Sequence, residues 1–141
     1  MARAYAKRLE AELAIVDKRR ASPEKTEVMH ILGEVKGKTA VLVDDIVATA
    51  GSLIEALDAL SREGIKDAYA AISHGILSGT AIEKIKNCKL LKEVVITNSV
   101  PLEDAKKISK IKFVSIAPLL AEAIRRTHQE ESISSLFDVT R

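Results

Sequence analysis

The sequence predicts an α/β fold built on a mostly parallel, doubly wound sheet of about five strands flanked by helices. Apolar segments rich in β-branched residues alternate along the chain with segments whose apolar residues recur at helical spacing. Such alternation is typical of βαβ units, whose strands pair in parallel. The 141 residues, of which 47% are hydrophobic, are enough for one compact domain with a buried core.

The first 38 residues differ from the rest of the chain. Apolar side chains between residues 2 and 13 recur at helical spacing and predict an opening amphipathic helix. A short apolar run at residues 14–16 follows and ends at Asp17. Residues 18–38 are mostly polar, so we expect either a mobile loop or an antiparallel ribbon there.

The alternating pattern begins at residue 39. Residues 39–43 form a continuous apolar run, as expected of a strand buried on both faces. Apolar residues at helical spacing follow between positions 53 and 60, and Gly64 closes that helix. The same reasoning predicts strands at 68–72, 93–97 and 113–116 and helices at 79–86, 104–108 and 118–128.

The composition excludes several classes of function. Lys and Arg number 22 and Asp and Glu 20, and only 3% of residues are aromatic, which argues against a nucleic-acid partner. The single cysteine, Cys88, allows neither an internal disulfide nor a multi-cysteine metal site and suits a reducing compartment. No apolar run approaches the roughly 20 residues that span a bilayer, and the N-terminus is too charged for a signal peptide. We therefore expect a cytoplasmic protein with no membrane partner.

The richest polar cluster follows the predicted strand at residues 39–43. Asp44 and Asp45 come directly after it, and the small residues 49–52 (Thr-Ala-Gly-Ser) open the next helix. Ligands of parallel α/β sheets bind beyond the carboxyl ends of the strands. Backbone N–H groups at a helix start favour an anion, and carboxylates bind sugar hydroxyls or Mg²⁺. These residues predict a phosphate-binding turn at 49–52, called the cradle below, beside an acidic pair.

An ordinary structural interpretation of the same residues also stands. Asp44 and Asp45 would then only end a strand, and Thr49 or Ser52 would be a common N-cap. Two acids at the end of a buried strand slightly favour a ligand-binding site over this structural interpretation.

Residues 41–52 resemble the ribose-phosphate-binding signature of the phosphoribosyltransferase superfamily. Nearly the whole chain resembles the C-terminal domain of the ribose-phosphate pyrophosphokinases, also called phosphoribosyl pyrophosphate synthetases, and this implies a phosphoribosyltransferase-like fold. The matching segments occur in the same order as in that family, at residues 17–20, 41–45, 73–79, 95–99, 117–124 and 131–137.

The resemblance implies an activity and roles for particular residues. Enzymes of this family transfer the pyrophosphoryl group of MgATP to the 1-hydroxyl of ribose 5-phosphate, which gives phosphoribosyl pyrophosphate and AMP. Asp44 and Asp45 would contact the ribose hydroxyls directly or through Mg²⁺, and the cradle residues Thr49, Ala50, Gly51 and Ser52 would hold the 5-phosphate.

Two basic residues match the mobile catalytic loop of the family. Lys18 and Arg20 would there neutralise charge on the transferring phosphates. Taken without the resemblance, Lys18, Arg19 and Arg20 would be a solvated run of charge.

Further expectations concern assembly. Ser132, Ser134 and Phe137 match a tail that helps to form an allosteric site between subunits, and the family forms homo-oligomers. His74 has no chemical role that the resemblance supplies, so we interpret it as structural or at an interface.

The chain departs from the family pattern in two ways. Ala48 stands where the family usually has a third aspartate, and the loss of this carboxylate should weaken ribose binding or catalysis. Residues 1–141 read as one domain without the N-terminal partner domain that supplies much of the ATP site. We therefore expect little or no synthetase activity from the chain alone. The alternative is a non-catalytic regulatory subunit of a synthetase.

Overall fold

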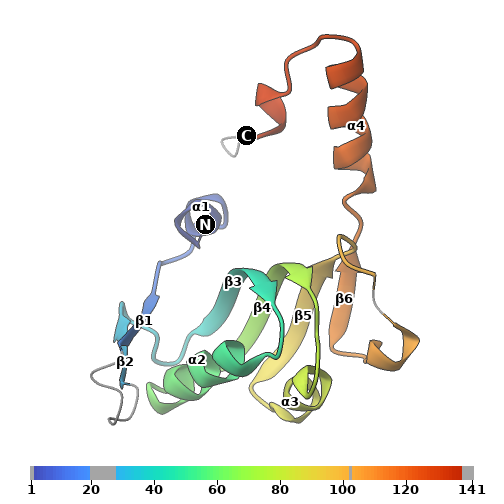
Figure 1. Cartoon of the computed structure of the whole chain (residues 1–141). Helices are drawn as coiled ribbons and strands as arrows, with labels where there is room; N and C mark the ends of the chain where they lie inside the picture. The colour runs from blue at the N-terminus through green and yellow to red at the C-terminus, as the bar shows by residue number, and fades with distance from the viewer. Residues whose placement is uncertain (1, 20–27, 102, 138–141) are drawn as a thin grey trace.

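A computed structural model of the chain describes residues 2–19, 28–101 and 103–137. Figure 1 shows the order of the elements along the chain. The helices are α1 (Ala2–Arg8), α2 (Gly51–Arg62), α3 (Ala81–Asn87) and α4 (Ala117–His128), with short 3₁₀ helices η1 (Asp104–Lys106) and η2 (Ser134–Leu136). The strands are β1 (Ile15–Arg19), β2 (Val28–Leu32), β3 (Thr39–Val47), β4 (Asp67–Gly75), β5 (Leu91–Thr97) and β6 (Ile111–Val114).

A parallel sheet in the order β3-β4-β5-β6 forms the centre of the molecule. Helices α2 and α3 lie against one face of this sheet (Figure 1), and the predicted α/β class is confirmed. The sheet has four strands and not about five, so that part of the prediction was wrong. The apolar run at residues 14–16 leads into β1, which pairs antiparallel with β2 and forms a separate ribbon. Among the described strands β1 pairs only with β2, so it does not extend the parallel sheet.

The core lies between the sheet and the α2–α3 layer. Its largest fully buried side chains come from α2, α3, β5 and the segment after β4; they are Leu57, Leu77, Ile85, Leu91, Val94 and Ile96. Burying a side chain of this size contributes about 1.5–3 kcal/mol, so this layer supplies most of the hydrophobic stabilisation.

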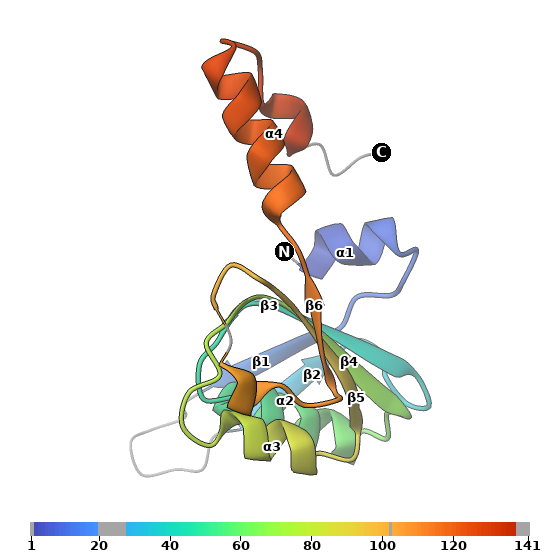
Figure 2. The same ribbon diagram turned by 90° about the vertical axis from the view of Figure 1, so that its right-hand side faces the viewer.

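The opposite side of the sheet is covered far less. Figure 2 shows α1 and α4 on this side, with α4 extending away from the strands. No residue of α4 is buried, and Val41 of β3 and Tyr69 of β4, neighbours in the sheet, are both exposed. Apolar surface therefore remains open on the side away from α2 and α3.

The opening helix is shorter than its periodicity predicts. It ends at Arg8, because Glu10 adopts a left-handed conformation (φ 51°) and the N–H of Ala11 donates to the carbonyl of Ala6. This hydrogen bond is the closing bond of a Schellman motif, which stops a helix whatever its apolar pattern. Within the described ranges, no helix has the length and apolarity needed to cross a membrane.

Candidate functional site

The acidic pair lies near the carboxyl end of β3. The strand continues to Val47, so Asp44 and Asp45 belong to it and do not follow it as predicted. Both side chains are exposed, and Asp44 is in register with Ile72 of β4. The Oδ1 atom of Asp44 accepts a hydrogen bond from the backbone N–H of Asp45 at 2.9 Å. The pair therefore presents carboxylate oxygens at the edge where parallel sheets bind ligands.

The cradle follows directly and leads into α2. Its residue Ala50 precedes the helix in a left-handed conformation (φ 57°) and makes no side-chain capping hydrogen bond. Neither Thr49 nor Ser52 caps α2, so the ordinary N-cap interpretation does not hold for these hydroxyls. The N–H groups of the first turn lack a capping side chain, and a left-handed residue at such a turn is typical of anion-binding loops.

The segment after β4 supports the loop that carries the cradle. The carbonyl of Val47 accepts hydrogen bonds from the N–H groups of Ile76 and Leu77 at 3.0 and 3.2 Å. The carbonyl of Ala48 accepts one from the N–H of Ser78 at 2.8 Å. These three hydrogen bonds attach the start of the loop between β3 and α2 to the segment that follows β4.

Helix α3 adds a charged support. The Nζ atom of Lys84 donates to the carbonyl of Thr49 at 3.3 Å. Neither this lysine nor the 76–78 segment was predicted to support the site. Lys84 is the fourth residue of α3. Exposed lysines in the first turn of a helix are common, so the sequence pattern alone gives no signal for this contact.

A hollow of about 720 Å³ lies beside the acidic pair. Its walls are the segment from α1 to β1, strand β3 and helix α2, and they include both Asp44 and Ser52. The structure therefore brings Asp44 and the cradle residue Ser52 to the same concave surface. Most of the remaining lining is apolar, with Tyr5 and Leu13 among the side chains.

The other predicted residues lie elsewhere or outside the described ranges. The backbone of Lys18 belongs to β1, and Arg20 lies outside the residues that the structure describes. Ser132, Ser134 and Phe137 belong to the segment after α4, apart from the loop between β3 and α2. There the Oγ of Ser132 accepts a hydrogen bond from the N–H of Ser134 at 3.2 Å, and Phe137 is exposed.

The donor set at the acidic pair fits Mg²⁺. Adjacent carboxylates supply the hard oxygen ligands that this ion prefers. Among the described residues, no three His, Cys, Asp or Glu side chains are grouped closely enough to form a metal site. Proteins often bind Mg²⁺ through one or two carboxylates, so Asp44 and Asp45 are the residues that could hold this ion.

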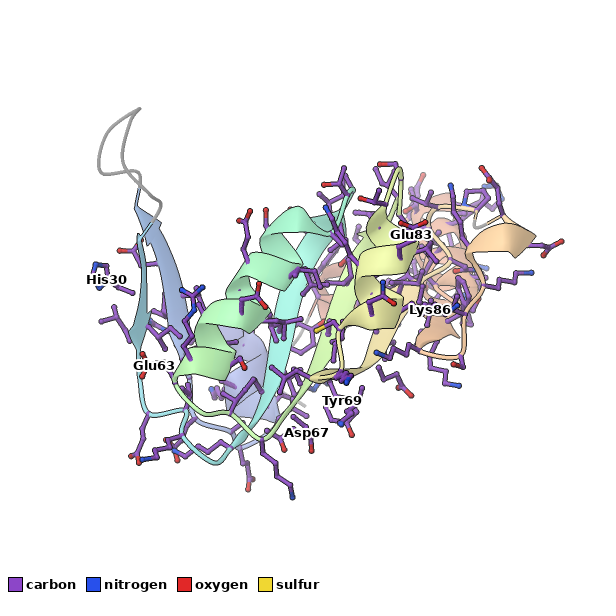
Figure 3. The ribbon with its side chains drawn as sticks, turned by 90° about the horizontal axis from the view of Figure 1, so that it is seen from below. His30, Glu63, Asp67, Tyr69, Glu83 and Lys86 are labelled. Atoms are coloured by element: carbon purple, nitrogen blue, oxygen red, sulfur yellow. The ribbon has the colours of Figure 1, made fainter. Side chains whose placement is uncertain are left out.

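Figure 3 shows the surface on the far side of the α2–α3 layer. Glu83 and Lys86 lie on α3, Glu63 follows α2, and Asp67 and Tyr69 stand at the start of β4, at the amino edge of the sheet. His30 lies on β2. Since β3 and β4 run parallel and the acidic pair lies near the carboxyl end of β3, the candidate site occupies the edge opposite Asp67 and Tyr69.

Comparison with known proteins identifies the family. The family described as the phosphoribosyl synthetase-associated domain matches residues 10–138. The chain belongs to this family. The match includes the acidic pair, the cradle and the tail after α4, and so covers every predicted site residue.

Relatives of this chain in several bacteria are named ribose-phosphate pyrophosphokinase. The chain is 54% identical over 136 residues to a ribose-phosphate pyrophosphokinase of Caldanaerobacter subterraneus subsp. tengcongensis, covering 96% of this chain and 43% of that protein. It is 51% identical over 136 residues to the Bacillus subtilis (strain 168) protein of this name, with the same coverage of both chains. The crystal structure of phosphoribosylpyrophosphate synthetase from Mycobacterium smegmatis matches with a TM-score of 0.80 and 33% identity, over 92% of this chain and 42% of that one. The chain thus spans less than half the length of these relatives.

Proposed function

We propose that this chain is the ribose 5-phosphate-binding, C-terminal half of a ribose-phosphate pyrophosphokinase. The whole enzyme would convert ATP and ribose 5-phosphate to phosphoribosyl pyrophosphate and AMP. Identities of 51–54% to proteins of that name support this assignment, as does the coverage of 42–43% of their length. The sequence resemblance to the C-terminal domain favours that half.

One observation carries the proposal. An uncapped helix start and an exposed acidic pair are joined by one short loop, and that loop is tied down from β4 and α3. The helix start suits a phosphate, since its N–H groups and dipole favour an anion. The carboxylates suit hydroxyl groups, since ionised carboxylates only accept hydrogen bonds. A sugar phosphate carries both kinds of group a few bonds apart.

Asp44 and Asp45 are also the residues that would hold Mg²⁺. Bound there, the ion would neutralise negative charge on phosphate oxygens. The carboxylates themselves would orient the ribose through its hydroxyls. Lys18 and Arg20, which match the catalytic loop, would offset charge on the transferring group.

The remaining parts of the proposal concern the whole enzyme. MgATP would bind largely to a second domain, so we expect this chain alone to have little or no synthetase activity. We also propose a cytoplasmic homo-oligomer in which Ser132, Ser134 and Phe137 contribute to a regulatory phosphate or nucleotide site. Mixing the chain with a separately expressed N-terminal half tests the first point, because product should form only in the mixture.

A titration with ribose 5-phosphate and Mg²⁺ tests the binding role, followed by backbone amide NMR shifts. We expect shifts centred on Asp44, Asp45 and the cradle. Asp44→Asn and Asp45→Asn should each weaken binding by about tenfold or more, since each removes a charge-assisted acceptor. Asp104→Asn is the matched control, because its carboxylate is exposed and lies on η1. Absence of shifts in the folded chain at millimolar ligand would contradict the proposal.

Ala48 favours a second candidate, a non-catalytic regulatory subunit. The loop lacks the third aspartate typical of the family, which removes one carboxylate from the sugar site. Ala48→Asp separates the two functions. In an enzyme half it should tighten ribose 5-phosphate binding in Mg²⁺ and raise the activity of the reconstituted enzyme. A regulator should gain neither.

A further inference from the structure

Polar side chains gather at the carboxyl ends of β4 and β5, beside the acidic pair of β3. The Nδ1 atom of His74 lies 2.8 Å from the Oγ of Ser99. The same Oγ donates to the carbonyl of Ser73 at 3.0 Å. Thr97 Oγ1 donates to that carbonyl at 2.6 Å and lies 2.9 Å from Ser99 Oγ. These four residues form one hydrogen-bonded group, called the His74 cluster below.

The hydrogen-bond pattern of the cluster favours one tautomer of His74. A carbonyl oxygen can only accept, so both contacts to Ser73 require protons from the hydroxyls of Thr97 and Ser99. Each hydroxyl has one proton, and both are then used. In this arrangement the hydrogen bond between His74 and Ser99 takes its proton from the histidine. Nδ1 carries the proton, and in the neutral ring Nε2 is left as an acceptor.

The position of His74 places this acceptor next to the candidate site. His74 is in register with Ile46 of β3, and both side chains are exposed. Neighbouring strands lie about 4.8 Å apart. The backbone of His74 therefore lies about that distance from the backbone of Ile46, the residue directly after Asp45. The chain after His74 continues into the segment that binds the carbonyls of Val47 and Ala48. The contact between Nδ1 and Ser99 holds the orientation of the imidazole, so Nε2 is not needed for that purpose.

We propose that His74 is a ligand-binding residue whose Nε2 accepts a hydrogen bond from a sugar hydroxyl of ribose 5-phosphate. This inference rests on the proposed function and extends it. The acidic pair and Nε2 are all acceptors, and a row of acceptors at one edge suits a ligand that donates several hydroxyl protons. Ser99 and Thr97 are positioning residues, since they fix the ring and its tautomer without reaching the sugar.

Long-range ¹H–¹⁵N correlation of the imidazole in the full chain tests the tautomer directly. We expect Nδ1 protonated and Nε2 unprotonated in the neutral ring. Ser99→Ala should shift the ring toward the Nε2–H form, because Nδ1–H loses its acceptor. Ser115→Ala is the matched control: this serine lies at the same edge and bonds Asn98, and it should leave the tautomer unchanged. A protonated Nε2 in the unsubstituted chain would overturn the inference.

Ribose 5-phosphate titration tests the binding role. The Nε2 resonance should move on binding, and His74→Asn should weaken binding by about threefold to tenfold, as expected for one neutral hydrogen bond. The asparagine amide can still donate to Ser99 but has no atom equivalent to Nε2. Binding of inorganic phosphate should not change, because the cradle holds that group.

The two proposals fail in different ways. If the unsubstituted chain binds ribose 5-phosphate while Nε2 stays still and His74→Asn binds equally well, the role of His74 is wrong and the proposed function stands. If the unsubstituted chain binds no ribose 5-phosphate, both the proposed function and the ligand role of His74 are wrong. The tautomer measurement is independent of either result.

Discussion

Lys110 closes the end of α3 with a single side chain. Its ammonium group donates to the carbonyls of Ile85, Lys86 and Cys88 at 3.2, 3.2 and 2.7 Å. These carbonyls lie at or just after the helix C-terminus, where backbone acceptors lack intrahelical partners and a cation is favoured.

Lys110→Met should therefore lower the free energy of unfolding by about 1–3 kcal/mol, since charged hydrogen bonds to backbone acceptors are lost. Urea denaturation measures this change. Lys107→Met is the control: Lys107 forms an exposed pair with Asp104 at 2.6 Å, and its loss should cost less than about 1 kcal/mol. Equal effects of the two substitutions would contradict the capping role.

Gly75 leaves no room for a side chain at the end of β4. A Cβ atom there would lie 2.8 Å from Cδ1 and 3.1 Å from Cγ2 of Ile96, a fully buried core residue. Gly75→Ala should destabilise the protein by about 1–3 kcal/mol, the usual cost of overpacking.

Ile96→Val removes the Cδ1 atom that the new methyl group would strike. The double variant should then be more stable than the sum of the two single effects predicts. Additive losses in urea denaturation would show that the close approach to Ile96 is not the cause.

Left-handed residues end three helices of the described chain in the same way. Glu10, Gly64 and Glu130 have φ of 51°, 79° and 58°. In each case the next residue donates its N–H to the carbonyl five positions back, as in a Schellman motif. The ends of these three helices are therefore set by backbone conformation at single positions.

Gly64→Ala should cost about 1 kcal/mol, because a left-handed conformation is unfavourable for a residue with a Cβ atom. The nearest atom to that Cβ is Lys36 Cγ at 3.6 Å, an ordinary contact, so the cost comes from the backbone. Gly51→Ala at the start of the same helix has no positive φ and should be neutral or stabilising in thermal denaturation. A neutral Gly64→Ala would contradict this reasoning.

Ion pairs hold the end of α4 and the tail that follows it. Glu122 accepts hydrogen bonds from Arg125 and Arg126, which lower the pKa of its carboxyl from 4.5 to about 2. Arg126 also donates to the carbonyl of Ser132 and the Oγ of Ser135 at 3.2 and 2.6 Å. Arg126 thus connects Glu122 of α4 to the tail residues Ser132 and Ser135.

Since the folded pKa of Glu122 lies below the unfolded value, its contribution is complete above about pH 4.5 and is lost as pH falls toward 2. NMR titration of the Glu122 carboxyl should give a midpoint near 2, and the Arg126 Nε–H signal should weaken over the same range. Glu122→Gln should abolish this pH dependence. A midpoint near 4.5 would show that the arginines do not hold the carboxylate in solution.

On the scale of the whole molecule, apolar surface remains on the side away from α2 and α3. Leu119, Leu120 and Ile124 of α4 are between 51% and 69% exposed, and Tyr69 on the sheet is 41% exposed. Exposed apolar surface of this extent is typical of interfaces.

We therefore expect the purified chain to self-associate, with an average mass that rises with concentration in sedimentation equilibrium. Leu120→Glu combined with Ile124→Glu should lower the association constant by at least about tenfold, because a charge is costly in a buried contact. Lys86→Glu on α3 is the control and should have little effect, since this residue lies on the other side of the sheet. A strictly monomeric chain would contradict the expectation.

The sequence by itself determined the α/β class, the parallel pairing of its main strands and the position of the acidic pair near the carboxyl end of a strand, although β3 extends past the pair to Val47. These follow from local periodicity: a buried parallel strand needs a continuous apolar run, and a helix needs apolar residues on one side. Four strands of the sheet and the helices α2 and α4 match the predicted segments within a few residues.

Only the tertiary structure decided which partner each segment takes. The apolar run at residues 14–16 looks the same whether it joins the sheet or pairs with β2, because hydrogen-bond partners are chosen across long stretches of chain. For the same reason the sequence showed His74, Ser99 and Lys84 only as separate polar residues. Folding brings the carboxyl ends of β3, β4 and β5 together. At that edge His74 contacts the hydroxyl of Ser99, 25 residues further along the chain, and the hydroxyls of Ser99 and Thr97 both donate to the carbonyl of Ser73.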